Sequence, residues 1–373
     1  MKPPDPAAAR GLSSEAQVSP LIAHLLLQRG ITSAEQAQLF LKPALSHLHS
    51  PYLMLGMSAA VERLRAAIAG KDTILIYGDY DVDGTLAIVI LKKAIELCGG
   101  VADFHVPHRI KDGYGMKSDV IEQAAAADVR LIISVDTGIR AFAAAETAHR
   151  LGLDLIVTDH HLPEVTGIPQ ALAVLNPNQP GCGYPCKELC GAGVAFKLAQ
   201  ALLEGAGLER LLPSFIKMVA IATIADAVPL IGENRVLAKL GLAGLRKPVN
   251  AGLKALFEVA SVGGNGSAPS ASDVAFRIAP RLNAAGRMDV ANDVIELFTT
   301  RETEQAQKIS AKLNQLNAER QNEEARIVKE LQERLDGDAA QREPYCLVLD
   351  GDGWHRGVIG IVATRVVERY GRP

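Results

Sequence analysis

The chain has 373 residues and a formal net charge of −3, with 48% hydrophobic, 22% charged and 4% aromatic residues. This length suits two or three domains of roughly 150 residues each, and the composition is that of a soluble globular protein. The near-neutral charge excludes a basic surface over the whole molecule, and the few aromatic rings leave little for stacking against bases. Any binding of nucleic acid must therefore rest on a local groove or on bound cations.

The sequence carries no sign of export or membrane insertion. Residues 1–10 are rich in Pro and Ala and lack the apolar core of a signal peptide. No run approaches the ~18–20 apolar residues that span a membrane. Five cysteines, an odd number, favour a reducing compartment without structural disulfides. We therefore expect a cytoplasmic protein with no membrane partner.

Residues 1–70 predict a helical lead-in. Residues 1–20 are expected to form a loose segment, and two helical patterns follow within residues 21–41. The second pattern begins after Ser33, a residue type that caps helix N-termini. A further helix is predicted over residues 57–69 and ends at Gly70.

Residues 71–299 predict an α/β domain. Short apolar runs alternate with helical patterns at 85–97, 118–127 and 141–151; the runs lie at 73–77, 101–106, 131–135, 155–158 and 173–175. This alternation predicts a parallel sheet with helices on both faces. Helical patterns at 191–204 and 211–223 open a helical part, about 190–299, which includes a flexible loop rich in Gly and Ser at 261–272.

Residues 300–336 predict one long connecting helix, because both signs of charge alternate there with sparse apolar positions. A linker is expected at 337–344, a strand at 345–349 and a helix up to residue 370. About 30 residues are too few to bury a core of their own. We therefore expect residues 345–373 to be the truncated start of a second α/β domain.

Three aspartates, Asp79, Asp81 and Asp83, directly follow the first predicted strand and stand two residues apart. Three carboxylates so close together repel one another unless a cation lies between them. Ligands of open α/β sheets bind at the carboxyl ends of the strands, and oxygen ligands suit divalent metals. Taken alone, the motif is equally compatible with a solvated acidic turn.

Further acidic and imidazole groups follow other strands. Asp136 ends the run at 131–135, and Asp159, His160 and His161 end the run at 155–158. Parallel strands end at one edge of a sheet, so these groups are expected to converge. Asp226 lies in an apolar stretch and could either join them or cap a helix end.

This set of side chains indicates a divalent metal centre. Carboxylates with imidazole and no thiolate favour Mn²⁺ or Mg²⁺ over structural zinc. So many carboxylates suit two ions, about 3.5–4 Å apart, which activate water and hold phosphate oxygens. The sequence thus predicts a phosphoester or phosphoanhydride hydrolase.

Two other groups have competing interpretations. Arg277, Arg281 and Arg287, with Asn283 among them, suit phosphate binding, although surface arginines often pair only with carboxylates. Cysteines 182, 186 and 190 lack the spacing of zinc sites, so we expect them to bind no metal.

Several motifs together resemble the DHH phosphoesterase superfamily, and within it the single-strand-specific 5′→3′ DNA exonucleases. The motifs shared with the superfamily are Asp79-Tyr80-Asp81-Val82-Asp83-Gly84, Asp136-Thr137-Gly138, Asp159-His160-His161 and Asp226. Those shared with the exonucleases lie at residues 109–115, 176–178, 191–197, 281–287 and 353–360. The resemblance extends from about residue 77 to 373 and implies a DHH catalytic domain followed by the start of a DHHA1-type domain.

The resemblance also implies roles for individual residues. Asp79, Asp81 and Asp136 would hold one ion, and Asp83, Asp136, His160 and Asp226 the other, with Asp136 as the bridge. His161 would contact the scissile phosphate, and Asp159 would support the histidines. The candidates for substrate contacts are Arg109, Arg281, Asn283, Arg287 and His355.

The resemblance implies recombination and repair as the setting, with single-stranded DNA as substrate and with single-strand-binding protein and a helicase as partners. Two alternatives stay open. One is a DHH-family phosphodiesterase acting on short oligonucleotides or cyclic dinucleotides. The other is a non-catalytic binding scaffold.

Overall fold

The structure is a computed structural model that describes residues 5–264, 266–288, 291–337 and 344–373. The first helices, α1 (Pro6–Ala16), α2 (Pro20–Gln28) and α3 (Ala34–Leu41), pack around a small core of their own. The expectation of a loose segment before residue 20 is wrong. Asp5 caps α1 by accepting a 2.9 Å hydrogen bond from the amide of Ala7, and Pro6 fits the first helical turn. Ser33 caps α3, as predicted.

A single sheet of five parallel strands forms the centre of the molecule and confirms the predicted fold class. Its strands are β1 (Thr73–Gly78), β2 (Ala102–His105), β3 (Val129–Val135), β4 (Asp154–Thr158) and β5 (Ala173–Leu175). The order across the sheet is β2-β1-β3-β4-β5. From β1, the chain adds β2 on one side and β3, β4 and β5 on the other, so the strand order switches between β1 and β3. Doubly wound sheets bind ligands at such a switch point.

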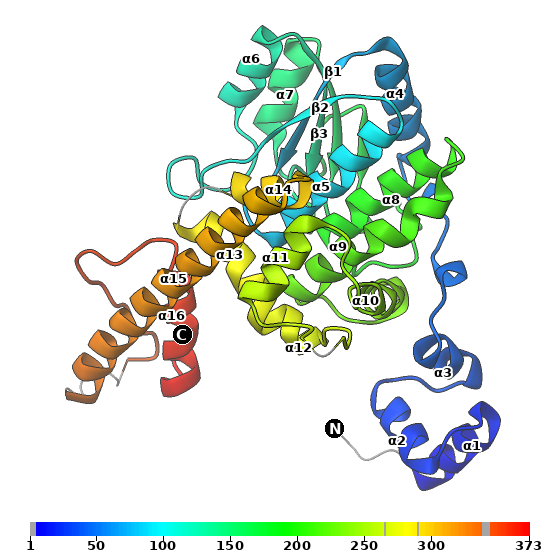
Figure 1. The fold of residues 1–373 in the computed structure, drawn as a ribbon, viewed down its shortest axis with the longest axis vertical. Coiled ribbons are helices and arrows are strands. Elements are labelled where there is room, and N and C mark those ends of the chain that lie inside the picture. The colour runs from blue at the N-terminus through cyan, green and yellow to red at the C-terminus, as the bar shows by residue number, and fades with distance from the viewer. Residues whose placement is uncertain (1–4, 265, 289–290, 338–343) are drawn as a thin grey trace.

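Helices cover both faces of the sheet (Figure 1). Two short helices, η1 (Leu45–His47) and η2 (Pro51–Leu53), lead into α4. Helices α4 (Met57–Gly70), α5 (Val82–Leu97) and α8 (Gly191–Glu204) share one apolar core with Ile76 and Ile133. On the opposite face, α6 (Ser118–Ala126) and α7 (Phe142–Arg150) share a second core with Ile132 and Val157. Neighbouring strand residues point to opposite faces, and helices cover both faces. Almost every residue of β3 is therefore buried.

The helical part lies beside α5 and α8. It consists of η3 (Glu209–Leu211), α9 (Leu212–Ala225), α10 (Gly232–Gly244), α11 (Ala251–Val259), α12 (Ala271–Asp273), a π-helical turn η4 (Val274–Ile278), α13 (Ala279–Met288) and α14 (Asn292–Thr299). The predicted loop at 261–272 is irregular up to the start of α12 in the part that the structure describes.

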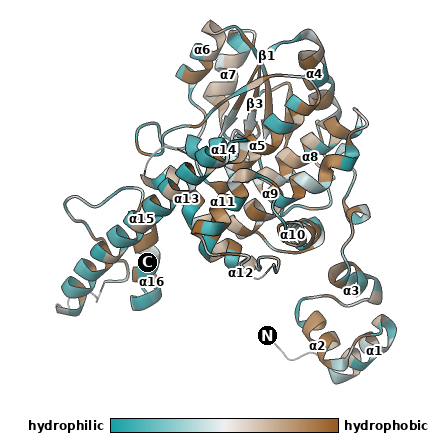
Figure 2. Cartoon of the chain, viewed as in Figure 1, coloured by the Kyte–Doolittle hydropathy of each residue, from teal (hydrophilic) through white to brown (hydrophobic). Residues whose placement is uncertain are grey.

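Helix α15 (Thr303–Gly337) leaves this body and carries α16 (Ile359–Tyr370) alongside it (Figure 1). Its surface is mostly hydrophilic (Figure 2), as the charge pattern predicts. Its last turns share a small core with α16, formed by Leu331, Leu335, Val358 and Val362. No helix among the described residues is long and apolar enough to cross a membrane.

The strand predicted at 345–349 is wrong for this structure. These residues pair with no strand in the described part of the chain, and the amide of Leu347 donates instead to the carbonyl of Pro373. An apolar run forms a strand only when a neighbour accepts its backbone hydrogen bonds. The linker expected at 337–344 lies mostly at 338–343, outside the described residues.

Candidate metal centre

The predicted acids meet at the carboxyl edge of the sheet. Asp79 follows β1 and Asp136 follows β3, the two strands at which the strand order reverses, and Asp159 follows β4. Their exposed fractions are 5%, 2% and 1%, and that of Asp83 is 2%. The burial of Asp79 and Asp83 excludes a solvated turn as the account of the first motif. A buried carboxylate needs a proton, a hydrogen-bond donor or a cation.

Two helix N-termini hold the second and third aspartates of the first motif. Asp81 caps α5 by accepting hydrogen bonds from the amides of Asp83 and Gly84, at 2.9 and 3.0 Å. Asp83 accepts hydrogen bonds from the amides of Gly191 and Ala192, at 2.6 and 2.9 Å, at the start of α8. Helix N-termini stabilise negative charge, so α5 and α8 fix these carboxylates in place.

Asp136 has a strained backbone and a crowded side chain. Its φ of +58° lies in the left-handed region, which few non-glycine residues adopt and which recurs at functional sites. A Cβ atom at position 191 would collide with the Asp136 carboxylate. Gly191 is therefore required so that α8 can approach this carboxylate.

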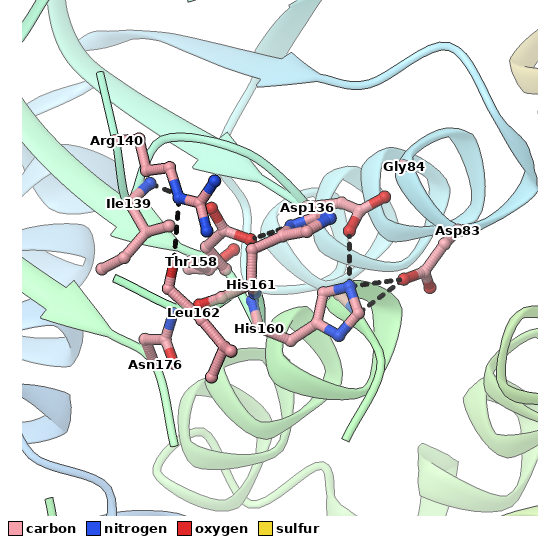
Figure 3. A network of polar contacts seen from close by, with 12 residues as sticks. Asp83, Gly84, Asp136, Ile139, Arg140, Thr158, His160, His161, Leu162 and Asn176 are labelled. Atoms are coloured by element: carbon pink, nitrogen blue, oxygen red, sulfur yellow. Dashed lines mark hydrogen bonds and ion pairs between the residues drawn. The ribbon is translucent and has the colours of Figure 1, made fainter. Parts of the chain in front are cut away.

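The acids and histidines form three overlapping groups, in each of which the ligand atoms lie within 4.8 Å of one another. The groups are Asp79, Asp81 and Asp136; Asp83, His160 and Asp226; and Asp136, His160 and His161. Nε2 of His160 lies 3.3 Å from Asp136 and 3.9 Å from Asp83 (Figure 3). The same atom lies 3.8 Å from Asp226. His160 and Asp136 therefore connect the groups.

Two carboxylate oxygens in this cluster lack a hydrogen-bond donor. Oδ1 of Asp79 and Oδ1 of Asp136 are buried and have no hydrogen-bond partner among the described residues; the latter lies 3.3 Å from Nε2 of His160 without forming a hydrogen bond to it. Native proteins leave few such atoms, and a bound ion is one explanation. The residues present thus fit divalent cations, with oxygen ligands in the majority.

The raised pKa values of the carboxyl groups also favour a bound cation. Burial, followed by the charge of Asp81, raises the pKa of Asp79 to about 7. Burial, followed by the charge of Asp83, also raises the pKa of Asp226 to about 7. The pKa of Asp136 is raised well above its usual range by burial and by the neighbouring carboxylates, Asp83 first. A cation would remove this repulsion, because it favours the charged form of every ligand.

Asp159 and His161 form a separate pair beside the cluster. Oδ1 of Asp159 lies 2.7 Å from Nδ1 of His161, and Oδ2 accepts a hydrogen bond from the amide of Ile139. Burial alone would raise the pKa of Asp159, but the hydrogen bond and charge of His161 hold it below its usual range. The same hydrogen bond raises the pKa of His161. Because Nδ1 is engaged, Nε2 is the nitrogen left for a substrate or an ion.

The predicted substrate residues divide into two sets. The Arg109 guanidinium lies 4.8 Å from the ring centroid of Tyr80, within the first aspartate motif. Oδ1 of Asn283 accepts a 3.1 Å hydrogen bond from the amide of Val82, between two of the aspartates. Burial, followed by the positive charges of Arg109 and Arg320, lowers the pKa of Arg287. These three side chains therefore lie near the acids.

The other two candidates are engaged elsewhere. Arg281 donates to Asn314 and to two backbone carbonyls, which fastens α13 to α15 and to the end of α11. Nδ1 of His355 accepts a hydrogen bond from the amide of Gly357. Gly357 also accepts a 3.1 Å hydrogen bond from Arg287 through its carbonyl. The segment at 355–357 thus contacts Arg287 on α13 rather than the acids.

Sequence reasoning missed some features around the centre. The residue pattern did not indicate that the amides of Gly191 and Ala192 would bind Asp83, although two glycines at a helix start could have pointed to a close approach. A buried polar cluster also went unnoticed. In it, Lys197 lies 3.0 Å from Glu233, which accepts a 2.5 Å hydrogen bond from Tyr184. Cysteines 182, 186 and 190 are buried free thiols.

Known proteins are similar to this chain in sequence and in fold. Residues 73–223 match the family described as DHH family, N-terminal domain. The chain is 39% identical over 370 residues to the single-stranded-DNA-specific exonuclease RecJ of Bacillus subtilis, and 37% identical over 374 residues to that of Escherichia coli. A crystal structure of exonuclease RecJ bound to manganese matches with a TM-score of 0.78 and 35% identity, over 88% of this chain and 80% of that one. The chain belongs to the RecJ family. The resemblance inferred from the motifs is thereby confirmed.

The alignments cover nearly all of this chain but only part of each relative. The alignments cover 99% and 96% of this chain, but only 46% of the Bacillus RecJ and 63% of the Escherichia RecJ. The RecJ of Thermus thermophilus in complex with Mn²⁺ has a TM-score of 0.85 at 32% identity, over 100% of this chain and 52% of that one. The chain therefore spans about half to three fifths of these longer relatives.

Proposed function

We propose that the protein is a metal-dependent 5′→3′ exonuclease that hydrolyses the phosphodiester bonds of single-stranded DNA. The observation that carries the proposal is the buried cluster of Asp79, Asp81, Asp136 and their neighbours, in which two carboxylate oxygens lack a donor. Membership of the RecJ family, whose named relatives are single-stranded-DNA-specific exonucleases, supports the substrate.

The ligand groups support two ions, either Mn²⁺ or Mg²⁺. Asp79, Asp81 and Asp136 would hold one ion; Asp83, Asp136, His160 and Asp226 would hold the other. Such a pair supplies a nucleophilic hydroxide at neutral pH and neutralises charge on the attacked phosphate. RecJ structures that contain Mn²⁺ or Mg²⁺ support this choice of metal.

The chain's own residues would position the substrate. His161, oriented through Nδ1 by Asp159, would present Nε2 to the scissile phosphate. Arg109 and Arg287 would contact backbone or terminal phosphates, since guanidinium forks match phosphate oxygens. Asn283 would fix the loop that carries the aspartates, through its hydrogen bond to Val82. The engaged guanidinium of Arg281 makes it a weaker candidate for direct contact.

The setting is proposed by family membership alone. The protein would work in the cytoplasm, in recombination and repair, on strands that a helicase has opened and single-strand-binding protein has covered. The alternatives, a phosphodiesterase of short or cyclic nucleotides and a non-catalytic scaffold, find no specific observation in their favour.

Hydrolysis of a 5′-phosphorylated, 3′-labelled single strand tests the proposal. With Mn²⁺ the chain should release mononucleotides from the 5′ end, and Asp136→Asn should abolish release. Lys329→Met, far along α15 and well exposed, is the matched control. Equal digestion of duplex, digestion from the 3′ end, or full activity of Asp136→Asn would contradict it.

A further inference from the structure

A hollow of about 670 Å³ lies between η4, α13, α15 and α16, and two of its lining residues adjoin the acidic cluster. Ala225, one of the lining residues, directly precedes Asp226 in the chain. Asn283, also in its wall, accepts the hydrogen bond from Val82 between Asp81 and Asp83. A volume of this size suits a bound organic ligand, and the hollow lies next to the segments that carry Asp81, Asp83 and Asp226.

The wall of this hollow is positively charged. Its lining contains Arg287, Arg320 and Arg365 and the carboxylate of Glu324. Glu324 pairs with both Arg320, at 2.5 Å, and Arg365, at 3.1 Å, and Arg365 also pairs with Glu368, which does not line the hollow, at 3.1 Å. Arg287 has no carboxylate partner among these pairs, so the lining keeps an excess of positive charge. The positive charges of Arg109 and Arg320 help to lower the pKa of Arg287, after burial as the largest cause. An anionic chain entering the hollow would relieve this repulsion.

Phe276 is the one aromatic residue among the described residues that line the hollow. Its side chain is 76% exposed, in a chain with only 4% aromatic residues. It lies on the π-helical turn η4, a local distortion that often accompanies functional sites. A phenyl ring exposed to water contributes no hydrophobic stabilisation to the free protein, because its apolar surface stays hydrated. The ring is therefore available to a ligand in the hollow.

We infer that Phe276 stacks on an unpaired base of the DNA strand and thereby contributes to the choice of single strands. The inference rests on the proposed function, because it takes a DNA strand as the ligand. Arginines for phosphates beside an aromatic ring for bases are the combination with which single strands are bound. A base within a duplex already stacks on both sides and offers no free face to the ring.

Two 5′-phosphorylated decamers with phosphorothioate linkages, which resist cleavage, test the inference in the presence of Mn²⁺. One carries thymine bases and the other carries abasic sugars, so their charges are equal. Phe276→Leu should weaken binding of the thymine decamer about tenfold and change the abasic affinity less than twofold, whereas Phe276→Trp should bind like the unmodified chain. Tyr52→Leu removes an exposed aromatic ring outside the hollow and should change neither affinity.

Some outcomes would overturn the inference. These are unchanged binding by Phe276→Leu, equal weakening for both decamers, or failure of the unmodified chain to bind the thymine decamer more tightly than the abasic one. Hydrolysis of bis(p-nitrophenyl) phosphate with Mn²⁺ reports separately on the proposed chemistry, without a DNA strand. Absence of that hydrolysis together with the predicted binding pattern would overturn the proposed function while supporting the role of Phe276.

Discussion

The backbone amide of Gly191 donates a 2.6 Å hydrogen bond to Oδ2 of Asp83, so the first turn of α8 directly contacts one part of the acidic cluster. The same glycine faces Asp136, whose carboxylate occupies the space that a Cβ atom would need. The start of α8 thus positions two proposed ligands at once, one by donating to it and the other by leaving room for it.

Gly191→Ala is therefore expected to weaken Mn²⁺ binding at least tenfold, because either α8 or the Asp136 carboxylate must move. Isothermal titration of the metal-free protein with Mn²⁺ measures this. Gly193→Ala, on the same helix, places its Cβ 3.3 Å from the Leu189 side chain, with no carboxylate among its nearest neighbours, and should leave the affinity within about twofold. Equal affinities for the two variants would contradict the role given to Gly191.

Metal binding should depend on pH through Asp79 and Asp226, whose pKa values are raised to about 7 mainly by burial. In the unfolded chain these carboxyls titrate near pH ~4. Between about pH 4 and 7 the folded metal-free protein holds protons that the unfolded chain has released, so its stability falls as pH rises through this window. Mn²⁺ must displace these protons, and its stabilising effect should therefore be larger at pH 8 than at pH 6. Thermal unfolding with EDTA or Mn²⁺ at both pH values tests this, and an equal Mn²⁺-induced shift would refute it.

The sequence allowed the sheet and the acidic cluster to be predicted for one physical reason. Each strand of a parallel sheet ends at the same edge, so acids after β1, β3 and β4 had to converge once the alternation was recognised. Asp226 was ambiguous, because a residue at a helix end can cap or ligate. The structure places it at the end of α9 and also 3.8 Å from His160, so it combines the helix-end position with proximity to the cluster.

Other features depend on contacts between distant segments that local patterns do not encode. Arg281 looked like a phosphate ligand because of its residue type, but α15 lies close enough for Asn314 to accept its hydrogen bond at 2.9 Å. The run at 345–349 has the composition of a strand, yet no described strand lies beside it. Phe276 was unremarkable in sequence, since only the fold shows that its ring is exposed in the hollow.

Asp136→Asn should separate stability from metal binding. The Asp136 carboxylate is buried among other carboxylates, Asp83 above all, and its pKa is raised well above its usual range. An amide of the same shape removes this repulsion and should stabilise the metal-free protein by on the order of 1 kcal/mol. The stabilisation by Mn²⁺ should be lost, because the proposed bridging ligand is gone. Differential scanning calorimetry with and without Mn²⁺ measures both effects, and a destabilised metal-free variant would argue against charge repulsion at this position.

Lys197 and Glu233 form a buried ion pair that holds α8 against α10 and the connector before α4. Their side chains are 1% and 0% exposed, and the Lys197 ammonium also donates to the carbonyl of His49 at 2.7 Å. Lys197→Met leaves the Glu233 charge without its cation and should cost about 3–5 kcal/mol of unfolding free energy. The double variant Lys197→Met/Glu233→Gln removes both charges and should cost less than the single one.

Urea unfolding of the metal-free chain measures these differences. Lys329→Met breaks the pair with Glu333 on α15, where the two side chains are 79% and 71% exposed, and should change the stability by less than about 1 kcal/mol. If the double variant is no more stable than Lys197→Met alone, the loss comes from packing rather than from the uncompensated charge. Because α8 begins at the amides that bind Asp83, the single variant should also weaken Mn²⁺ binding, and the double variant should restore part of it.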